Sequence, residues 1–150
     1  MFGADDLYQE IIMDHNRSPR NYGAIDTPTV ESEGFNPLCG DQIKISMVLA
    51  GDKILDIAFD GVGCAISKSS ASIMTVELKG KKIVDAQNIF AAFRLMITGK
   101  DIDETHVEAL GDAEVLGGVS KYPARIKCAS LAWHTFNSAL SGNPNGVTTE

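Results

Sequence analysis

The sequence has few cysteines, few basic residues and no long apolar run, and each shortage excludes a class of protein. An odd count of 3 cysteines argues against a framework of disulfide bonds. The 13 Lys and Arg residues are outnumbered by 20 Asp and Glu, and the net charge of −7 argues against a nucleic-acid partner. No apolar stretch approaches the ~20 residues that cross a bilayer. Residues Met1–Asp6 lack the basic and apolar regions of a signal peptide. We therefore expect a cytoplasmic protein with neither a nucleic-acid nor a membrane partner.

The spacing of apolar residues predicts a single α+β domain. A chain of 150 residues, 44% of them hydrophobic, can bury one core. Alternation over 43–49 and 54–59, around a turn at Gly51-Asp52, predicts a β-hairpin, and residues 29–34 predict a weaker strand. Apolar positions at helical spacing predict helices at 7–15, 64–79, 82–98, 103–110 and 123–140, with a loop over 111–120. We expect a small three-stranded antiparallel sheet packed against about five to six helices. This domain spans residues 1–142, and residues 143–150 are expected to be a disordered tail.

The three cysteines and one aspartate carry most of the functional information. Cys39 and Asp41 flank Gly40 where a strand is expected to begin. Residues two apart in a strand point to the same face, and glycine permits backbone conformations that other residues resist. A thiolate and a carboxylate can therefore converge on one ion at this turn.

Cys64 follows Gly61-x-Gly63 and opens a predicted helix. Free backbone N–H groups and the positive end of the helix dipole favour a thiolate at such a position. The rival interpretation of Gly-x-Gly is a phosphate-binding loop. The segment lacks both the third glycine and the Lys-Ser/Thr pair of such loops, so it is poor evidence for one.

Cys128 lies about one turn inside the last predicted helix and faces its apolar side, so a buried structural cysteine is a live alternative. Three thiolates and a carboxylate are the right donors to surround zinc. The same donors could hold an iron–sulfur cluster, or a thiol could carry persulfide sulfur. Arg125, Lys127 and Lys68 are candidates to offset the negative charge of such a site.

The histidines fit this site less well. His134 is six positions after Cys128, roughly 240° around the helix, and should point elsewhere. His15 and His106 stand beside polar residues, and we expect both to be solvated. This weakens any interpretation as a Cys–His nucleophile, which needs the two groups within hydrogen-bond reach.

Taken together, the cysteine segments resemble those of the IscU/SufU proteins of iron–sulfur cluster assembly, which are similar to the N-terminal part of NifU. The resemblance covers nearly the whole chain. It rests on Asn36-Pro37-x-Cys39-Gly40-Asp41, Gly61-x-Gly63-Cys64-Ala65-Ile66-Ser67, Lys121 to Trp133, and Leu7-Tyr8-x-x-Ile11-Ile12-x-Asp14-His15 with Pro19-Arg20-Asn21.

Two features favour the SufU branch. IscU-type proteins have a histidine before the third cysteine, where this chain has Lys127, and they lack the extra segment at about residues 97–118. The resemblance implies zinc ligated by Cys39, Asp41, Cys64 and Cys128. It also implies that Cys39 accepts persulfide sulfur from a SufS-type cysteine desulfurase, that Arg125 supports this activity, and that downstream cluster-assembly proteins are further partners.

Two other functions stay open. The same four ligands could hold iron or a 2Fe–2S cluster on a scaffold that hands the cluster on. The protein could also be a structural zinc domain, although such sites favour Cys and His at short paired spacings. Whether the protein is an enzyme in the strict sense depends on which function applies.

Overall fold

The computed structural model describes residues 4–142 and 146–148. These residues form five α-helices, one 3-10 helix (η1) and four strands. In chain order they are α1 (Ala4–Arg17), β1 (Val30–Asn36), β2 (Asp41–Ala50), β3 (Lys53–Val62), α2 (Ala65–Leu78), α3 (Ile83–Ile97), α4 (Glu104–Leu110), η1 (Gly111–Lys121), α5 (Pro123–Leu140) and β4 (Val147–Thr148). None of the helices in the described part of the chain is both long enough and apolar enough to span a membrane.

The sheet has four strands in the order β3-β2-β1-β4. The first three are antiparallel, as predicted, but β4 pairs parallel to β1, with Val147 opposite Gly34. The expectation of a three-stranded antiparallel sheet is therefore wrong by one short strand, which comes from the segment expected to be a disordered tail. Residues 143–145 and 149–150 of that segment lie outside the described residues. Two residues of strand have too little periodicity for a sequence pattern to reveal them.

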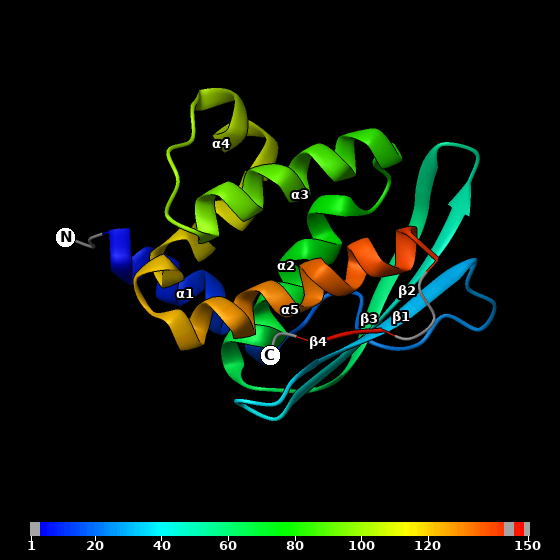
Figure 1. Ribbon diagram of the computed structural model, residues 1–150, viewed down its shortest axis with the longest axis horizontal. Coiled ribbons are helices and arrows are strands. Elements are labelled where there is room, and N and C mark those ends of the chain that lie inside the picture. The colour runs from blue at the N-terminus through cyan, green and yellow to red at the C-terminus, as the bar shows by residue number, and fades with distance from the viewer. Residues whose placement is uncertain (1–3, 143–145, 149–150) are drawn as a thin grey trace.

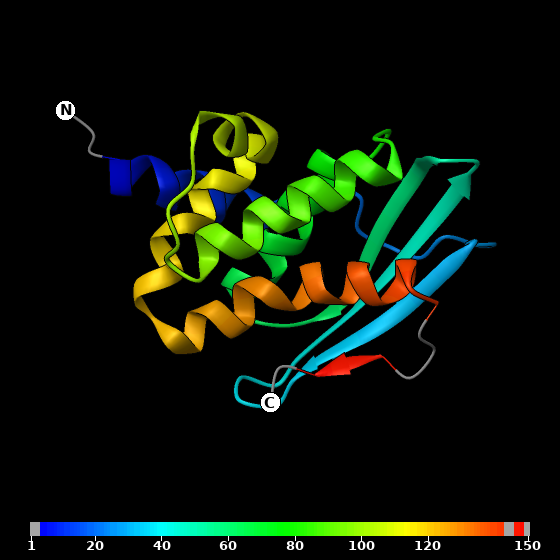
Figure 2. The same ribbon diagram turned by 45° about the horizontal axis from the view of Figure 1, so that its top comes forward.

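The helices gather on one side of the sheet (Figures 1 and 2). Along β1 the buried residues alternate with exposed ones, because only one face of the strand meets the helices. Gly34 lets α5 approach this face closely: a Cβ there would collide with Thr135 Oγ1 and lie 2.9 Å from Leu131 Cδ1. The last helix therefore runs directly over β1, which fixes Cys128 above the end of that strand.

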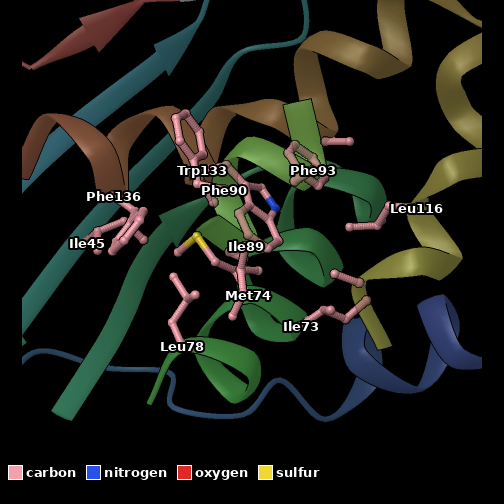
Figure 3. Close-up of a cluster of buried hydrophobic side chains, with 14 of the residues drawn as sticks. Ile45, Ile73, Met74, Leu78, Ile89, Phe90, Phe93, Leu116, Trp133 and Phe136 are labelled. Atoms are coloured by element: carbon pink, nitrogen blue, oxygen red, sulfur yellow. The ribbon is translucent and has the colours of Figure 1, made fainter. Parts of the chain in front are cut away.

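The core lies between the sheet and α2, α3 and α5 (Figure 3). The ring of Trp133 on α5 stacks on Phe93 of α3, with 4.2 Å between centroids. Ile45, Met74 and Phe136 are also fully buried, and they come from β2, α2 and α5. Side chains of this size each contribute about 1.5–3 kcal/mol when buried. The burial of these side chains therefore holds α5 and α2 in a fixed relation to the sheet.

Two segments differ from the sequence prediction. Residues 111–121 form η1 and not a loop, and Ala113, Leu116 and Val119 of this helix are buried. Three glycines and two acidic residues obscured its pattern. Residues 4–17 form a longer first helix than the predicted 7–15. The serine-rich segment after Cys64 is helical, as predicted.

Candidate metal-binding site

The turn between β1 and β2 positions Cys39 and Asp41. Asn36 and Asp41 are paired across the end of the hairpin, and the carbonyl oxygen of Asn36 accepts hydrogen bonds from the N–H groups of Cys39 (3.3 Å) and Gly40 (2.9 Å). Gly40 has φ +73°, the left-handed region that glycine tolerates best. The turn leaves Cys39 exposed and Asp41 buried. The backbone role predicted for Gly40 is therefore confirmed.

Asp41 is held on both carboxylate oxygens. The side-chain amide of Asn36 donates to Oδ2 at 2.9 Å, and the backbone N–H of Cys64 donates to Oδ1 at 2.9 Å. The second bond connects the hairpin turn to the beginning of α2. Gly63 makes room for it, because a Cβ there would lie 2.9 Å from Asp41 Oδ1 and would overlap Ser67 Oγ.

Cys64 is the N-cap residue of α2, where the sequence predicted a helix start. Its thiol lies 3.8 Å from the hydroxyl of Ser67, one turn further along. That hydroxyl also donates to the carbonyl oxygen of Cys64 at 3.2 Å.

Cys128 is buried, on the face of α5 that covers the end of β1. Its Sγ atom lies 3.4 Å from Sγ of Cys39 and 3.4 Å from the amide nitrogen of Asn36. Burial raises the pKa of the Cys128 thiol, and the neighbouring Cys39, Cys64 and Asp41 raise it further. Without a bound cation, this thiol is therefore strongly held in its neutral form.

Three of the four predicted ligands form one tight group. The ligand atoms of Cys39, Asp41 and Cys128 all lie within 4.8 Å of one another. Cys64 is outside that group, although its thiol is close enough to raise the pKa of Cys128. Thiolate sulfur with one carboxylate oxygen is a donor set that suits zinc or ferrous iron.

The predicted cations lie around the site and not in it. The guanidinium of Arg125 stacks on the ring of Tyr122 (4.8 Å), and the ammonium of Lys68 lies over Tyr22 (5.6 Å). Lys127 lines a separate cavity beside β4. Among the ion pairs of the described residues, none joins these cations to Asp41. Charge balance by direct pairing therefore stays a prediction.

The histidines do not join the thiols, as predicted, but the expectation of a solvated His15 is wrong. His15 is 7% exposed, and its Nδ1 lies 2.7 Å from the hydroxyl of Ser72 on α2. Because α1 packs against α2, a polar face of the first helix becomes buried. His134 packs edge-on against Phe90, and His106 caps α4 by accepting from the Asp103 N–H.

Sequence reasoning missed Asn36 as a member of the site. Its side chain is fully buried and joins Asp41 to Cys128. The Asn36-Pro37 pair indicated only a turn. The available signal was the position of Asn36 in the chain. It lies five residues before Asp41, at the end of β1, and β1 pairs with β2, which begins at Asp41.

The fold and the site define a class of protein: a small α+β domain that presents three thiols and a carboxylate at one end of its sheet. The sequence matches the family described as NifU-like N terminal domain over residues 7–129. The chain belongs to this family, and the family predicted from the cysteine segments is confirmed.

Named relatives fall on both sides of the SufU/IscU division. The chain is 44% identical to the zinc-dependent sulfurtransferase SufU of Bacillus subtilis, with 95% of each chain covered. It is 39% identical to the iron–sulfur cluster assembly scaffold protein IscU of Streptococcus pyogenes, covering 93% of this chain and 86% of the relative. FiSufU of Fervidobacterium islandicum AW-1 is assigned as a scaffold protein for the SUF system. Its crystal structure matches the structure of this chain with a TM-score of 0.83. It shares 36% identity, with 92% of this chain and 99% of that chain covered.

Proposed function

We propose that this protein is a zinc-dependent sulfur acceptor for iron–sulfur cluster assembly. Zinc is held by Cys39, Asp41, Cys64 and Cys128, and Cys39 takes persulfide sulfur from a SufS-type cysteine desulfurase. The sulfur then passes to downstream cluster-assembly proteins in the cytoplasm. The relative named as a zinc-dependent sulfurtransferase supports this assignment.

The observation that carries the proposal is the unequal exposure of the paired thiols. Cys39 is exposed on a turn, whereas Cys128, with its Sγ atom 3.4 Å away, is buried. A partner can reach Cys39 without unfolding the site, while Cys128 and Asp41 stay in place beneath it. Sulfur transfer needs such an accessible thiol, and a purely structural metal site does not.

Zinc, when bound, would keep the ligating thiols deprotonated. The chain's own contribution is to aim Cys39 outward and to fix Asp41 between Asn36 and Cys64. In the transfer step, the Cys39 thiolate attacks the outer sulfur of the desulfurase persulfide. A new S–S bond forms at Cys39, the donor's S–S bond breaks, and the desulfurase cysteine leaves as a thiolate.

Arg125 is proposed to contact the desulfurase. Its side chain is exposed and borders a groove of about 410 Å³ between α1, η1 and the beginnings of α2 and α5. Ala65, which follows Cys64, lines the same groove, so a partner seated there would also reach the thiols. Arg125→Ala is expected to slow sulfur transfer with zinc content unchanged, and Arg94→Ala on the exposed side of α3 is the matched control.

The direct test is mass spectrometry of the zinc-loaded protein after incubation with a SufS-type desulfurase and cysteine. We expect one added sulfur on Cys39 in the wild type and no accepted sulfur in Cys39→Ala. Persulfide mapped to Cys64 or Cys128 in the wild type would overturn the role of Cys39. Mapping the added sulfur in the wild type does not depend on whether Cys39→Ala folds.

The second candidate is a scaffold on which a 2Fe–2S cluster forms between the same ligands. The relative named as the scaffold IscU supports it, because it is similar over nearly the same residues. Zinc, iron and acid-labile sulfide should be measured on protein purified without oxygen from its own host. About one zinc per chain without sulfide supports the acceptor, and iron with matching sulfide makes the protein a scaffold.

A further inference from the structure

A cavity of about 300 Å³ lies between α5 and β4, and none of the cysteines lines it. Figures 1 and 2 show β4 running beside α5. The residues that line it are Ile126, Lys127, Ser130, His134, Val147 and Thr148. None of these belongs to the four proposed metal ligands.

Three polar residues of the cavity form one stripe on α5. Lys127, Ser130 and His134 are spaced at i, i+3 and i+7, so they share a face of the helix. Cys128 is rotated at least about 100° away from each of them. The stripe is therefore directed away from the thiols, and a ligand bound to it would not be a ligand of the metal.

Ser130 carries an unused hydrogen-bonding group in this cavity. The residue is only 5% exposed, and its hydroxyl has no hydrogen bond to any residue that the structure describes. The hydroxyl oxygen is not among the fully buried unpaired atoms of the described residues, so it is open to the cavity and can bond a ligand there. In contrast, the buried Ser70 of α2 is fully paired with Ala129 and Trp133.

The electrostatic surroundings of the cavity favour an anion. Among the described residues that line it, Lys127 alone is permanently charged and none is acidic, although the whole chain has a net charge of −7. Burial lowers the pKa of His134, and the nearby Arg94 lowers it further. The ring is therefore neutral at pH 7 and offers one N–H donor.

We propose that this cavity binds a small oxyanion such as inorganic phosphate or sulfate. The Lys127 ammonium, the Ser130 hydroxyl and the His134 ring N–H supply three donors of the kind that oxyanions accept from. At about 30 Å³ per water molecule, the cavity holds such an anion together with several waters. The proposal goes beyond the proposed function and does not depend on it.

The test is a titration of the zinc-loaded protein followed by NMR, with sulfate and phosphate in separate arms at constant ionic strength. We expect saturable shifts of the His134 ring signals and of the backbone amides around Ser130. Lys127→Met should weaken binding about tenfold and Ser130→Ala about threefold to tenfold, as for the loss of one hydrogen bond. Lys53→Met removes an exposed charge at the beginning of β3 and should bind like the wild type.

Each remaining outcome counts against the proposal. Shifts that do not saturate would show only nonspecific attraction of anions to positive side chains. The same conclusion would follow if Lys53→Met weakened the shifts as much as Lys127→Met. Equal binding of acetate would overturn the assignment to tetrahedral oxyanions. Zinc content is measured after each titration. If phosphate removes zinc, the result with sulfate decides the test.

Discussion

Asn36 occupies the centre of the candidate site, although it is not one of the four proposed ligands. Its amide bonds Asp41 at 2.9 Å and lies 3.4 Å from Cys128 Sγ. Asn36→Ala should leave a buried carboxylate short of one donor and destabilise the fold by about 1–3 kcal/mol. Loss of such a supporting bond is expected to weaken zinc binding about 10–100-fold.

The measurement is zinc affinity by competition with a chelator, together with urea unfolding. Asn88→Ala, on the exposed side of α3, is the control and should change neither value. Unaltered zinc affinity in Asn36→Ala would mean that Asp41 is not a ligand, or that the turn alone holds it.

His15 gives the fold a dependence on pH. Burial lowers its pKa in the folded protein, and Arg20 lowers it further. Between its ordinary pKa of about 6.5 and the lower folded value, the unfolded chain binds a proton that the folded chain does not. The free energy of unfolding is therefore highest, as far as His15 is concerned, above about pH 6.5. It declines as the pH falls toward the pKa of His15 in the folded protein.

Urea unfolding between about pH 7.5 and about pH 5 should therefore show a shallower loss of stability in His15→Gln than in the wild type. His106→Gln is the matched control, because glutamine can replace histidine in the capping position of α4. His134, whose pKa is also lowered, stays in all three proteins. Parallel curves for His15→Gln and the wild type would contradict this role.

At the scale of elements, α2 shows how polar residues can form part of a core. Ser67, Ser69, Ser70, Ser72 and Thr75 are all buried on this helix. Ser70 donates to the Ala129 carbonyl at 2.6 Å and accepts from the Trp133 ring N–H at 3.0 Å, so it joins α2 to α5. Sequence alone predicted the helix from the apolar residues between the serines, but it could not predict these partners, which are distant in the chain.

Ser70→Ala should leave the Trp133 N–H without its partner and cost about 1–3 kcal/mol of stability. Trp133 is the only tryptophan, so its fluorescence should shift as the ring environment changes. Ser69→Ala is the matched control, because within the described residues the Ser69 hydroxyl bonds the Ala65 carbonyl of its own helix and no group of α5. Equal losses in the two variants would show that helix packing, and not the bond to Trp133, is what the serine provides.

For the whole molecule, local pattern was enough for the hairpin and most helices, and it singled out Cys39 and Asp41, which the structure groups with Cys128. Cys39, Asp41 and Cys64 each stand beside a glycine or at a helix start, and such positions are visible in sequence. The pairing of β4 with β1 and the burial of His15 depend on contacts between distant segments. Such contacts leave no periodic trace, so only the folded structure reveals them.

The site joins three parts of the molecule that are far apart in the chain. Asp41 and Cys39 belong to the hairpin turn, Cys64 to the beginning of α2, and Cys128 to α5. A metal ion bound by all four would restrain the whole sheet–helix interface, and its binding energy would count toward folding. Removing it should therefore lower the melting temperature of the entire domain and not only loosen one loop.

Chelation of zinc should lower the melting temperature by about 10 °C or more, since several kcal/mol are lost and each is worth about 2–4 °C in a domain of this size. Calorimetry with and without a chelator measures this. Cys39→Ser should already melt lower and should respond less to the chelator, because one ligand is missing. If the chelated wild type melts unchanged with its zinc removed, the metal does not stabilise the fold. The hydrogen bonds of Asp41 to Asn36 and Cys64 would then be sufficient to hold the site together.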